Sequence, residues 1–296
     1  MELTKAISLS LGGLNEPVVT SYRLGVIVHQ LYLSKALQGE PLKHLSRPRA
    51  SSTEFNNAIG KLLRNGIIEN HPNFPRNVYR ILGRVESDVG EVACTIDPFC
   101  CISHLSAMRF HGITNRLPAK LFISGPDRPH WHQRAREQMA NELGDQLPFY
   151  LDGGMPKLML PKMRRIDRME IHRFSTLSPI AFKIATETLL RVSTIGRTFL
   201  DMLRSPLLCG GMAHVIEVWE EYGQGYLQPI VSELERHGDP IDKVRAGYLL
   251  NEKLGIADET VNSWTKFARR GGSRRLDPTE PYMPRWSEKW CLSLNV

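Results

Sequence analysis

The sequence predicts an α+β fold in two domains. Its 296 residues, 42% of them hydrophobic, exceed the usual size of one domain and are enough to build a sizeable core. Helical and strand patterns are mixed up to residue 192, and the pattern from residue 193 onward is mainly helical. A polar stretch without periodicity at residues 84–90 marks the expected boundary, which gives domains at 1–88 and 89–296.

The chain is expected to begin with a poorly structured segment followed by two helices. Glycine and proline breakers at residues 12, 13 and 17 leave little room for regular structure in residues 1–19. Residues 22–37 have apolar side chains at helical spacing, and Gly39 with Pro41 ends that helix. Pro41 is suited to the first turn of a short second helix, which we expect to reach about Ser46.

Residues 51–66 carry the strongest helical signal in the chain. Ser51 and Glu54 have the spacing of a capping box, and Gly66 follows the last turn, where a left-handed residue is expected. Apolar side chains recur between these ends at helical spacing and form one stripe: Phe55, Ala58, Ile59, Leu62 and Leu63. Taken alone, this is the pattern of an ordinary amphipathic surface helix.

A β-hairpin is expected directly after this helix. Residues 67–69 and 78–82 are short strand patterns, separated by a turn at residues 71–77 that is rich in proline and asparagine and holds Arg76 near its tip. The order helix, short helix, turn, capped helix and hairpin predicts a winged helix-turn-helix, in which the capped helix lies in the major groove of DNA and the hairpin is the wing.

The charge distribution supports a polyanionic partner. The net charge is +7, and residues 41–84 hold eight basic residues against two acidic ones. Because this basic region coincides with the capped helix, we expect it to bind double-stranded DNA. Asn56 and Asn57 are predicted to read base edges, and the cations to bind phosphates. The full predicted DNA-binding set is Arg47, Arg49, Ser52, Thr53, Asn56, Asn57, Lys61, Arg64, Arg76 and Arg80.

The second domain is predicted to mix strands and helices. We expect helices at residues 100–111 and 131–143, with strands at 117–124 and 169–174. Further helices are predicted near residues 194–204, 211–222, 226–237, 240–254 and 258–269, with a closing strand at 290–295. Two basic clusters in this domain, at residues 157–173 and 266–275, are either solvated charge or sites for phosphate or an acidic partner.

Two segments of the second domain resemble a known family. Residues 102–114, ISHLSAMRFHGIT, resemble the "SHLSAL…HGL" segment of the AbiEi family. Residues 197–203, RTFLDML, followed by Pro206 and residues 209–212, CGGM, resemble the same family's "RTLLD…P…CGGI" segment. Gly196 stands where that family often has an acidic residue.

The resemblance implies an antitoxin of a type IV toxin–antitoxin abortive-infection system. Such a protein would bind inverted repeats in its own promoter through the N-terminal winged helix and repress its operon. Its C-terminal domain would counter a nucleotidyltransferase toxin. The toxin part of this expectation follows from the resemblance alone.

Catalytic and metal-binding patterns are weak. His104 and His111, with Cys100 and Cys101, are interpreted as packing residues because no second ligand pair accompanies them. Asp167, Glu170 and Arg173 have some similarity to a nuclease metal site but lack its lysine. We therefore expect no catalytic residues, no metal and no cofactor; the alternatives are a metal-dependent nuclease guided by the winged helix and an interaction adaptor that does not bind DNA.

Composition also predicts the compartment. No run of about 18 apolar residues is present to span a membrane, and the N-terminus lacks the pattern of a secretory signal. The five cysteines are an odd number without CxxC spacing, as in a reduced cytoplasmic protein. The sequence therefore predicts a cytoplasmic protein without a membrane partner.

Overall fold

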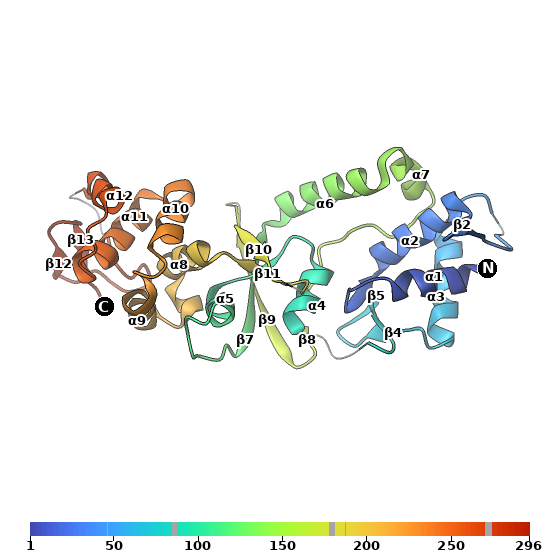
Figure 1. The fold of residues 1–296 in the computed structure, drawn as a ribbon, viewed down its shortest axis with the longest axis horizontal. Coiled ribbons are helices and arrows are strands. Elements are labelled where there is room, and N and C mark those ends of the chain that lie inside the picture. The colour runs from blue at the N-terminus through green and yellow to red at the C-terminus, as the bar shows by residue number, and fades with distance from the viewer. Residues whose placement is uncertain (46, 85–87, 178–180, 187, 270–273) are drawn as a thin grey trace. The chain divides into compact units, whose positions relative to one another are not determined.

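The computed structural model describes residues 1–45, 47–84, 88–177, 181–186, 188–269 and 274–296. The fold is mixed α/β, and Figure 1 traces its elements along the chain. It forms two compact units, residues 1–100 with 126–170 and residues 101–125 with 171–296. In the described ranges, each helix is too short or too polar to cross a membrane.

In the described residues, the first unit contains the helices α1 to α3 and the strands β1 to β5 of its N-terminal part, followed by three further helices and one further strand. Its elements are α1 (Leu3–Gly12), β1 (Val18–Thr20), α2 (Ser21–Ser34), β2 (Ala36–Leu37), β3 (Glu40–Pro41), α3 (Ser52–Arg64), β4 (Ile68–His71), β5 (Phe74–Ile81), α4 (Val89–Ile96), α6 (Arg128–Leu143), α7 (Leu147–Asp152) and β8 (Arg165–Ile166). A 3-10 turn, η1 (Gly144–Gln146), joins α6 to α7. Strands β1, β5 and β4 form one antiparallel sheet in that order.

Residues 1–19 are structured, contrary to the prediction. Ala6, Ile7 and Leu11 of α1 are spaced along one helical face and are buried in the core. The breakers at Gly12 and Gly13 end this helix and do not prevent it. Residues 18–20 then form β1, which pairs with β5.

The predicted short helix at 41–46 is also wrong over the described residues, and Ser46 lies outside them. Strands β2 and β3 form a hairpin here, with Leu37 opposite Glu40. The two turn residues Gln38 and Gly39 both have positive φ, 51° and 81°, which is the geometry of a tight hairpin turn. A hairpin therefore stands between α2 and α3 in place of a second helix.

Helix α3 begins and ends where the sequence predicts, although its cap differs. Ser51 is the N-cap, but its hydroxyl donates to the carboxylate of Glu54 and does not accept a backbone N–H. At the other end Gly66 has φ +63°, and the N–H groups of Gly66 and Ile67 donate to the carbonyls of Leu63 and Leu62. These two bonds satisfy the last helical carbonyls and turn the chain into β4.

The predicted hairpin is present but has a shorter turn. Strand β5 runs from Phe74, so the residues expected in the turn, including Arg76, are mostly in a strand. His71 faces Phe74 across a bulged position, and Pro72 with Asn73 forms the tip. Arg76 therefore lies along the strand and not at the tip of the hairpin.

Helices α6 and α7 belong to the first unit, which differs from the predicted boundary at 88/89. Met139, Leu143 and Tyr150 are buried in the same core as α1, α2 and α3. The Tyr150 ring lies edge-on to His29 of α2 at a centroid distance of 5.3 Å. A Cβ at Gly25 would lie 2.4 Å from the Tyr150 hydroxyl, so this glycine permits the close packing. The core of the first unit therefore includes residues that lie beyond the predicted boundary; residues 85–87 lie outside the described residues.

The second unit consists of a sheet and a helical C-terminal part. Its elements are β6 (Cys101–Ile102), α5 (His104–Phe110), β7 (Lys120–Pro126), β9 (Met169–Thr176), β10 (Phe182–Ile184), β11 (Arg191–Ser193), α8 (Ile195–Arg204), α9 (Met212–Tyr222), α10 (Leu227–His237), α11 (Pro240–Gly247), α12 (Glu259–Ser263), β12 (Trp286–Ser287) and β13 (Leu292–Ser293). The strand order in the sheet is β10-β11-β6-β7-β9, with the β8 strand pairing with the start of β9.

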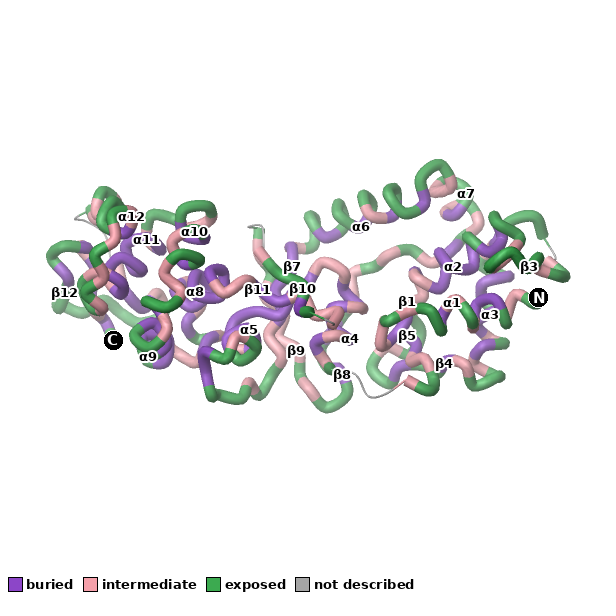
Figure 2. The backbone as a smooth tube through the Cα atoms, viewed as in Figure 1, coloured by how far each residue is buried: buried purple, intermediate pink, exposed green. Residues whose placement is uncertain are grey.

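Several predicted helices of this unit are confirmed and others are shortened. Residues 100–111 are not one helix, because Cys101 and Ile102 pair with β7 and α5 begins only at His104. The helix expected at 240–254 changes to a π-helical turn, η3 (Tyr248–Lys253), and that at 258–269 ends in a 3-10 turn, η4 (Trp264–Phe267). A further 3-10 turn, η2 (Pro206–Cys209), precedes α9. Figure 2 shows how much of these helices is buried.

Candidate nucleic-acid interface

Helix α3 has one buried face and one exposed face. Phe55, Ala58, Ile59 and Leu62 are buried in the core of the first unit. The exposed face carries six of the predicted DNA-binding residues, namely Ser52, Thr53, Asn56, Asn57, Lys61 and Arg64. Amide, hydroxyl and cationic side chains therefore gather on a single helical surface that is open to solvent.

Gly60 lies in the middle of this exposed face and was missed by the sequence prediction. A glycine inside a helix lowers stability by about 1 kcal/mol relative to alanine. No packing contact requires it here, because an added Cβ would meet only the Arg64 guanidinium, at 3.5 Å. A glycine that packing does not explain permits another molecule to approach the helix backbone closely. The signal in the sequence was a glycine on the polar side of an otherwise strong helix.

Arg47, which is predicted to bind DNA, has a partner inside the protein at the start of α3. The Arg47 guanidinium lies 3.3 Å from the carboxylate of Glu54, which is buried while Arg47 is largely exposed. Hydrogen bonding from the Ser51 hydroxyl, and to a smaller extent the charge of Arg47, lowers the pKa of Glu54 below its usual value. Glu54 is therefore a carboxylate that fixes the helix start and holds Arg47 beside it.

Arg49 and Ser52 also contact the first unit itself. The Arg49 guanidinium lies 4.0 Å from the centroid of the Phe149 ring in α7, a cation–π contact. The Ser52 N–H donates to the Gly153 carbonyl at 2.8 Å, although its hydroxyl is exposed. These contacts hold the residues before α3 against α7.

A hollow of about 310 Å³ borders one side of the exposed face. Asn57 and Lys61 line it from α3, Glu2 to Thr4 line it from the start of α1, and Lys43 and His44 line it from the connection after β3. Asn57 and Lys61 therefore border a recess, whereas Asn56 is exposed on the same helix. The two adjacent amides accordingly differ in their surroundings.

The hairpin β4–β5 has both a free and an engaged cation. Arg76 is exposed, and its backbone carbonyl accepts from the Ser21 hydroxyl at 3.2 Å and from the Tyr79 hydroxyl at 3.5 Å, while its guanidinium has no ion pair within the described residues. Arg80 instead pairs with the Asp167 carboxylate and lies 3.8 Å from Glu69. The Asp167 N–H donates to the Asn73 side chain at 2.7 Å, which ties the hairpin tip to the turn between β8 and β9. Arg80 is thus partly neutralised.

The ion pair of Arg80 also bears on the nuclease alternative. Asp167 is the carboxylate that the alternative places at a metal, and in the structure it binds a guanidinium. Within the described ranges, three or more histidine, cysteine or acidic side chains do not come together in a way that could hold a metal ion.

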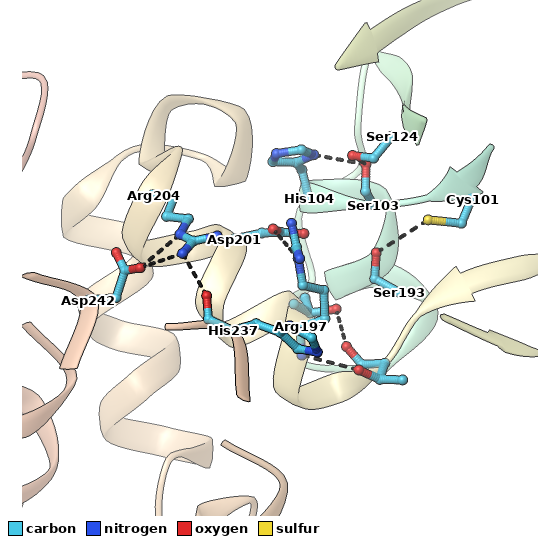
Figure 3. A network of polar contacts seen from close by, with 12 residues as sticks. Cys101, Ser103, His104, Ser124, Ser193, Arg197, Asp201, Arg204, His237 and Asp242 are labelled. Atoms are coloured by element: carbon cyan, nitrogen blue, oxygen red, sulfur yellow. Dashed lines mark hydrogen bonds and ion pairs between the residues drawn. The ribbon is translucent and has the colours of Figure 1, made fainter. Parts of the chain in front are cut away.

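The first of the two family-like segments contributes a buried polar network to the second unit (Figure 3). The Ser103 hydroxyl lies 2.8 Å from His104 Nδ1 and accepts from the Ser124 hydroxyl at 2.7 Å. All three side chains are buried, and burial lowers the pKa of His104. A serine beside a histidine is a nucleophile–base pair in many enzymes, but here both side chains are buried.

The second family-like segment packs next to the first. On α8, Arg197 Nε donates to the Asp201 carboxylate at 2.8 Å, and both side chains are buried. Helix α5, which follows Ser103, contacts α8, so the two segments form one polar interior (Figure 3). A Cβ at Gly196 would lie 2.2 Å from the Pro229 carbonyl of α10, and this close approach explains glycine at a position that is often acidic in the family.

The cysteine and histidine set has separate roles in packing. His111 Nε2 lies 2.7 Å from the Ser193 carbonyl, and Cys101 Sγ lies 3.9 Å from the Ser193 hydroxyl. His104 bonds to Ser103 instead. Each of these second-unit groups has its own hydrogen-bond partner.

No protein-family model matches the sequence, and a search of curated proteins finds no match.

Proposed function

We propose that the protein binds duplex DNA in a sequence-dependent way, with α3 in the major groove. The order α1, β1, α2, α3, β4, β5, together with a β1-β5-β4 sheet, is the arrangement expected of a winged helix. In this proposal the hairpin β4–β5 is the wing, and the β2–β3 hairpin occupies the connection before the recognition helix.

The exposed face of α3 is the observation that carries the proposal. It combines two amides, two cations and a glycine on a helix whose opposite side is fully packed. Asparagine can bond adenine through two hydrogen bonds, and cations bind phosphates. Gly60 would let the helix backbone come close to the floor of the groove.

The contacts inside the protein divide the predicted DNA-binding residues by role. Asn56, Asn57 and Thr53 are assigned to base edges, and Lys61, Arg64 and Arg76 to phosphates. Arg49 is assigned to holding α7, because its guanidinium already covers the Phe149 ring. Arg80 is assigned to the Asp167 ion pair, and Arg47 to orienting the start of α3.

The wider role is proposed from the family-like segments. An AbiEi-type antitoxin would bind inverted repeats in its own promoter, repress the operon and counter a nucleotidyltransferase toxin. The polar interior that Ser103, His104, Arg197 and Asp201 share is compatible with the second unit being the stable scaffold of such an activity. All five cysteines are free thiols, which suits the reducing cytoplasm.

Two substitutions on α3 test the DNA-binding proposal. We expect Asn57→Ala to reduce discrimination between the DNA upstream of the coding sequence and a scrambled duplex, because a bidentate base contact contributes about 1–3 kcal/mol. Arg64→Ala should weaken binding to both duplexes by a similar factor, because phosphates carry no sequence information. Fluorescence anisotropy with the two labelled duplexes measures both effects. Unchanged binding to both duplexes in both variants would refute the assignment.

Co-expression tests the antitoxin role separately. If the adjacent reading frame encodes a nucleotidyltransferase that stops growth, co-expression of this protein should restore growth. Failure of the wild-type chain to restore growth would reject the antitoxin role without bearing on the DNA-binding proposal. Rescue by the wild type but not by Asp201→Asn would show that the role needs the intact fold of the second unit.

A further inference from the structure

A segment near the C-terminus displays aromatic side chains to solvent. In residues 281–286 every residue is exposed, and the exposed fractions are 49% for Tyr282, 47% for Met283 and 55% for Trp286. Arg285 is exposed between the two aromatic residues. Large exposed aromatic side chains grouped in one short segment are typical of a binding surface.

Buried polar residues hold the backbone of this segment in place. The buried Ser293 hydroxyl accepts from the Met283 N–H at 3.0 Å and lies 2.8 Å from the Met283 carbonyl. The Leu294 N–H donates to the Arg285 carbonyl at 2.7 Å. The buried Asn295 amide donates to the Glu280 carbonyl at 3.0 Å. The segment is therefore pre-ordered, and little further ordering is needed when a ligand binds.

The chain on both sides of the aromatic residues is rich in cations. The described residues from 266 to 289 include six cations and three acidic residues: Lys266, Arg269, Arg274, Arg275, Arg285 and Lys289 against Asp277, Glu280 and Glu288. Asp277 is buried. Arg275 donates to the Glu280 carbonyl at 2.8 Å, which brings the basic cluster next to the aromatic segment. Arg270, which the sequence places in the same cluster, lies outside the described residues.

We propose that this surface binds single-stranded nucleic acid. Tyr282 and Trp286 would stack on bases, and the neighbouring cations would bind the backbone phosphates. A duplex suits the surface less, because its bases are stacked on one another and offer no free faces. An acidic protein would pair with the cations, whereas stacking on aromatic planes is the way in which unstacked bases are bound. This inference concerns the second unit alone and does not depend on α3.

The tryptophan content allows a direct test. The chain has five tryptophans, and Trp131, Trp219, Trp264 and Trp290 are each 0% exposed. Trp286 is therefore the tryptophan that a bound strand can quench. We expect oligo(dT) or oligo(rU) of about 15 nucleotides to quench its fluorescence at low salt, with the effect reduced as salt is raised. Stronger quenching by oligo(rU) would assign RNA, and stronger quenching by oligo(dT) would assign DNA.

Substitutions separate stacking from a general charge effect. By anisotropy with the same labelled strands, Trp286→Ala should weaken binding about tenfold, as for loss of one stacked base, whereas Trp286→Phe should retain most of it. Tyr282→Ala should show a similar loss. The control is Phe182→Ala, which removes another exposed aromatic residue of the same unit and should leave binding unchanged.

Three results would overturn the inference. These are no quenching by either strand at low salt, equal binding by Trp286→Ala and the wild type, or an equal loss in Phe182→Ala. A Lys61→Ala/Arg64→Ala variant should keep the quenching, so failure here is distinguishable from failure of duplex binding by α3. If neither strand quenches Trp286 but an acidic protein does, the surface is a protein-binding site.

Discussion

Helices α3 and α8 each carry cationic and other polar side chains, yet they place them in opposite surroundings. In α3 the cations Lys61 and Arg64 are exposed, and neither forms an ion pair with another of the residues that the structure describes. In α8 every residue from Gly196 to Leu203 is buried, and the Arg197 guanidinium is bonded to Asp201 one turn later. The same type of side chain is therefore available to a ligand in one helix and committed to the protein interior in the other.

The difference separates recognition from structural support. A buried charge must be paired, because taking it out of water without compensation is very unfavourable. An exposed charge contributes little to stability and is free to meet a phosphate. Substitutions in α8 should therefore act on folding, and substitutions on the exposed side of α3 should act on binding.

The largest effect is expected from Asp201→Ala. It leaves Arg197 buried without its main ionic partner, which should lower the free energy of unfolding by about 3–5 kcal/mol. Urea unfolding followed by circular dichroism measures the change. Glu220→Ala is the control, because its pair with Lys253 at 2.9 Å is half exposed, and we expect it to change stability by less than about 1 kcal/mol. Similar losses in the two variants would contradict the distinction between buried and exposed pairs.

A pH dependence of intermediate size is expected from the buried histidines. Burial lowers the pKa of His104 and of His111 below the ordinary value of 6.5. The unfolded chain then binds protons more readily than the folded one, so stability is complete above about pH 6.5 and falls as the pH is lowered further. The urea concentration at the midpoint of unfolding should thus decrease as the pH is lowered from about 7.5 to about 5.5. His104→Gln should flatten this dependence, whereas a change at the exposed His132 should leave it as it is.

The smallest effect in stability, and the one that most clearly separates the two helices, is expected at Gly60. Gly60→Ala should stabilise the protein by up to about 1 kcal/mol, because alanine is the better helix former and the site has room for a methyl group. Gly60→Gln should also stabilise α3 but should weaken duplex binding, because the side chain would fill the approach to the helix backbone. A Gly60→Gln variant that binds DNA as well as the wild type would show that this half-buried glycine has no part in recognition.

Local sequence signals predicted much of the secondary structure. Helix α3, its Gly66 terminus and the helices α8, α9 and α10 follow from helical spacing and breakers, which act over a few residues. The burial of Arg197 and Asp201 was not predictable in this way. Their spacing is that of a common exposed surface pair, and they are buried because α5, α9, α10 and α11 pack against α8.

The missed features depend on partners that are distant in sequence. In the sequence Arg80 and Arg49 look like free cations, because their partners lie far along the chain. The partner of Arg80 is Asp167, and that of Arg49 is the Phe149 ring. The core of the first unit includes side chains of α6 and α7, and no local sequence pattern near residue 88 predicts this. The turn at residues 38 and 39 carried a weak signal, because Gly39 readily adopts positive φ but Gln38, which does so here, is not a typical residue of such a turn.

The salt dependence of duplex binding tests the central claim most directly. Each neutralised phosphate contributes a slope of about −0.9 to the plot of log K against log salt concentration. We therefore predict that Lys61→Ala/Arg64→Ala reduces the magnitude of the slope for the upstream duplex by about 1.8, the value for two phosphate contacts. Lys183→Ala in the second unit should leave the slope unchanged. An unchanged slope in the double variant would contradict the assignment of α3 as the DNA-binding helix.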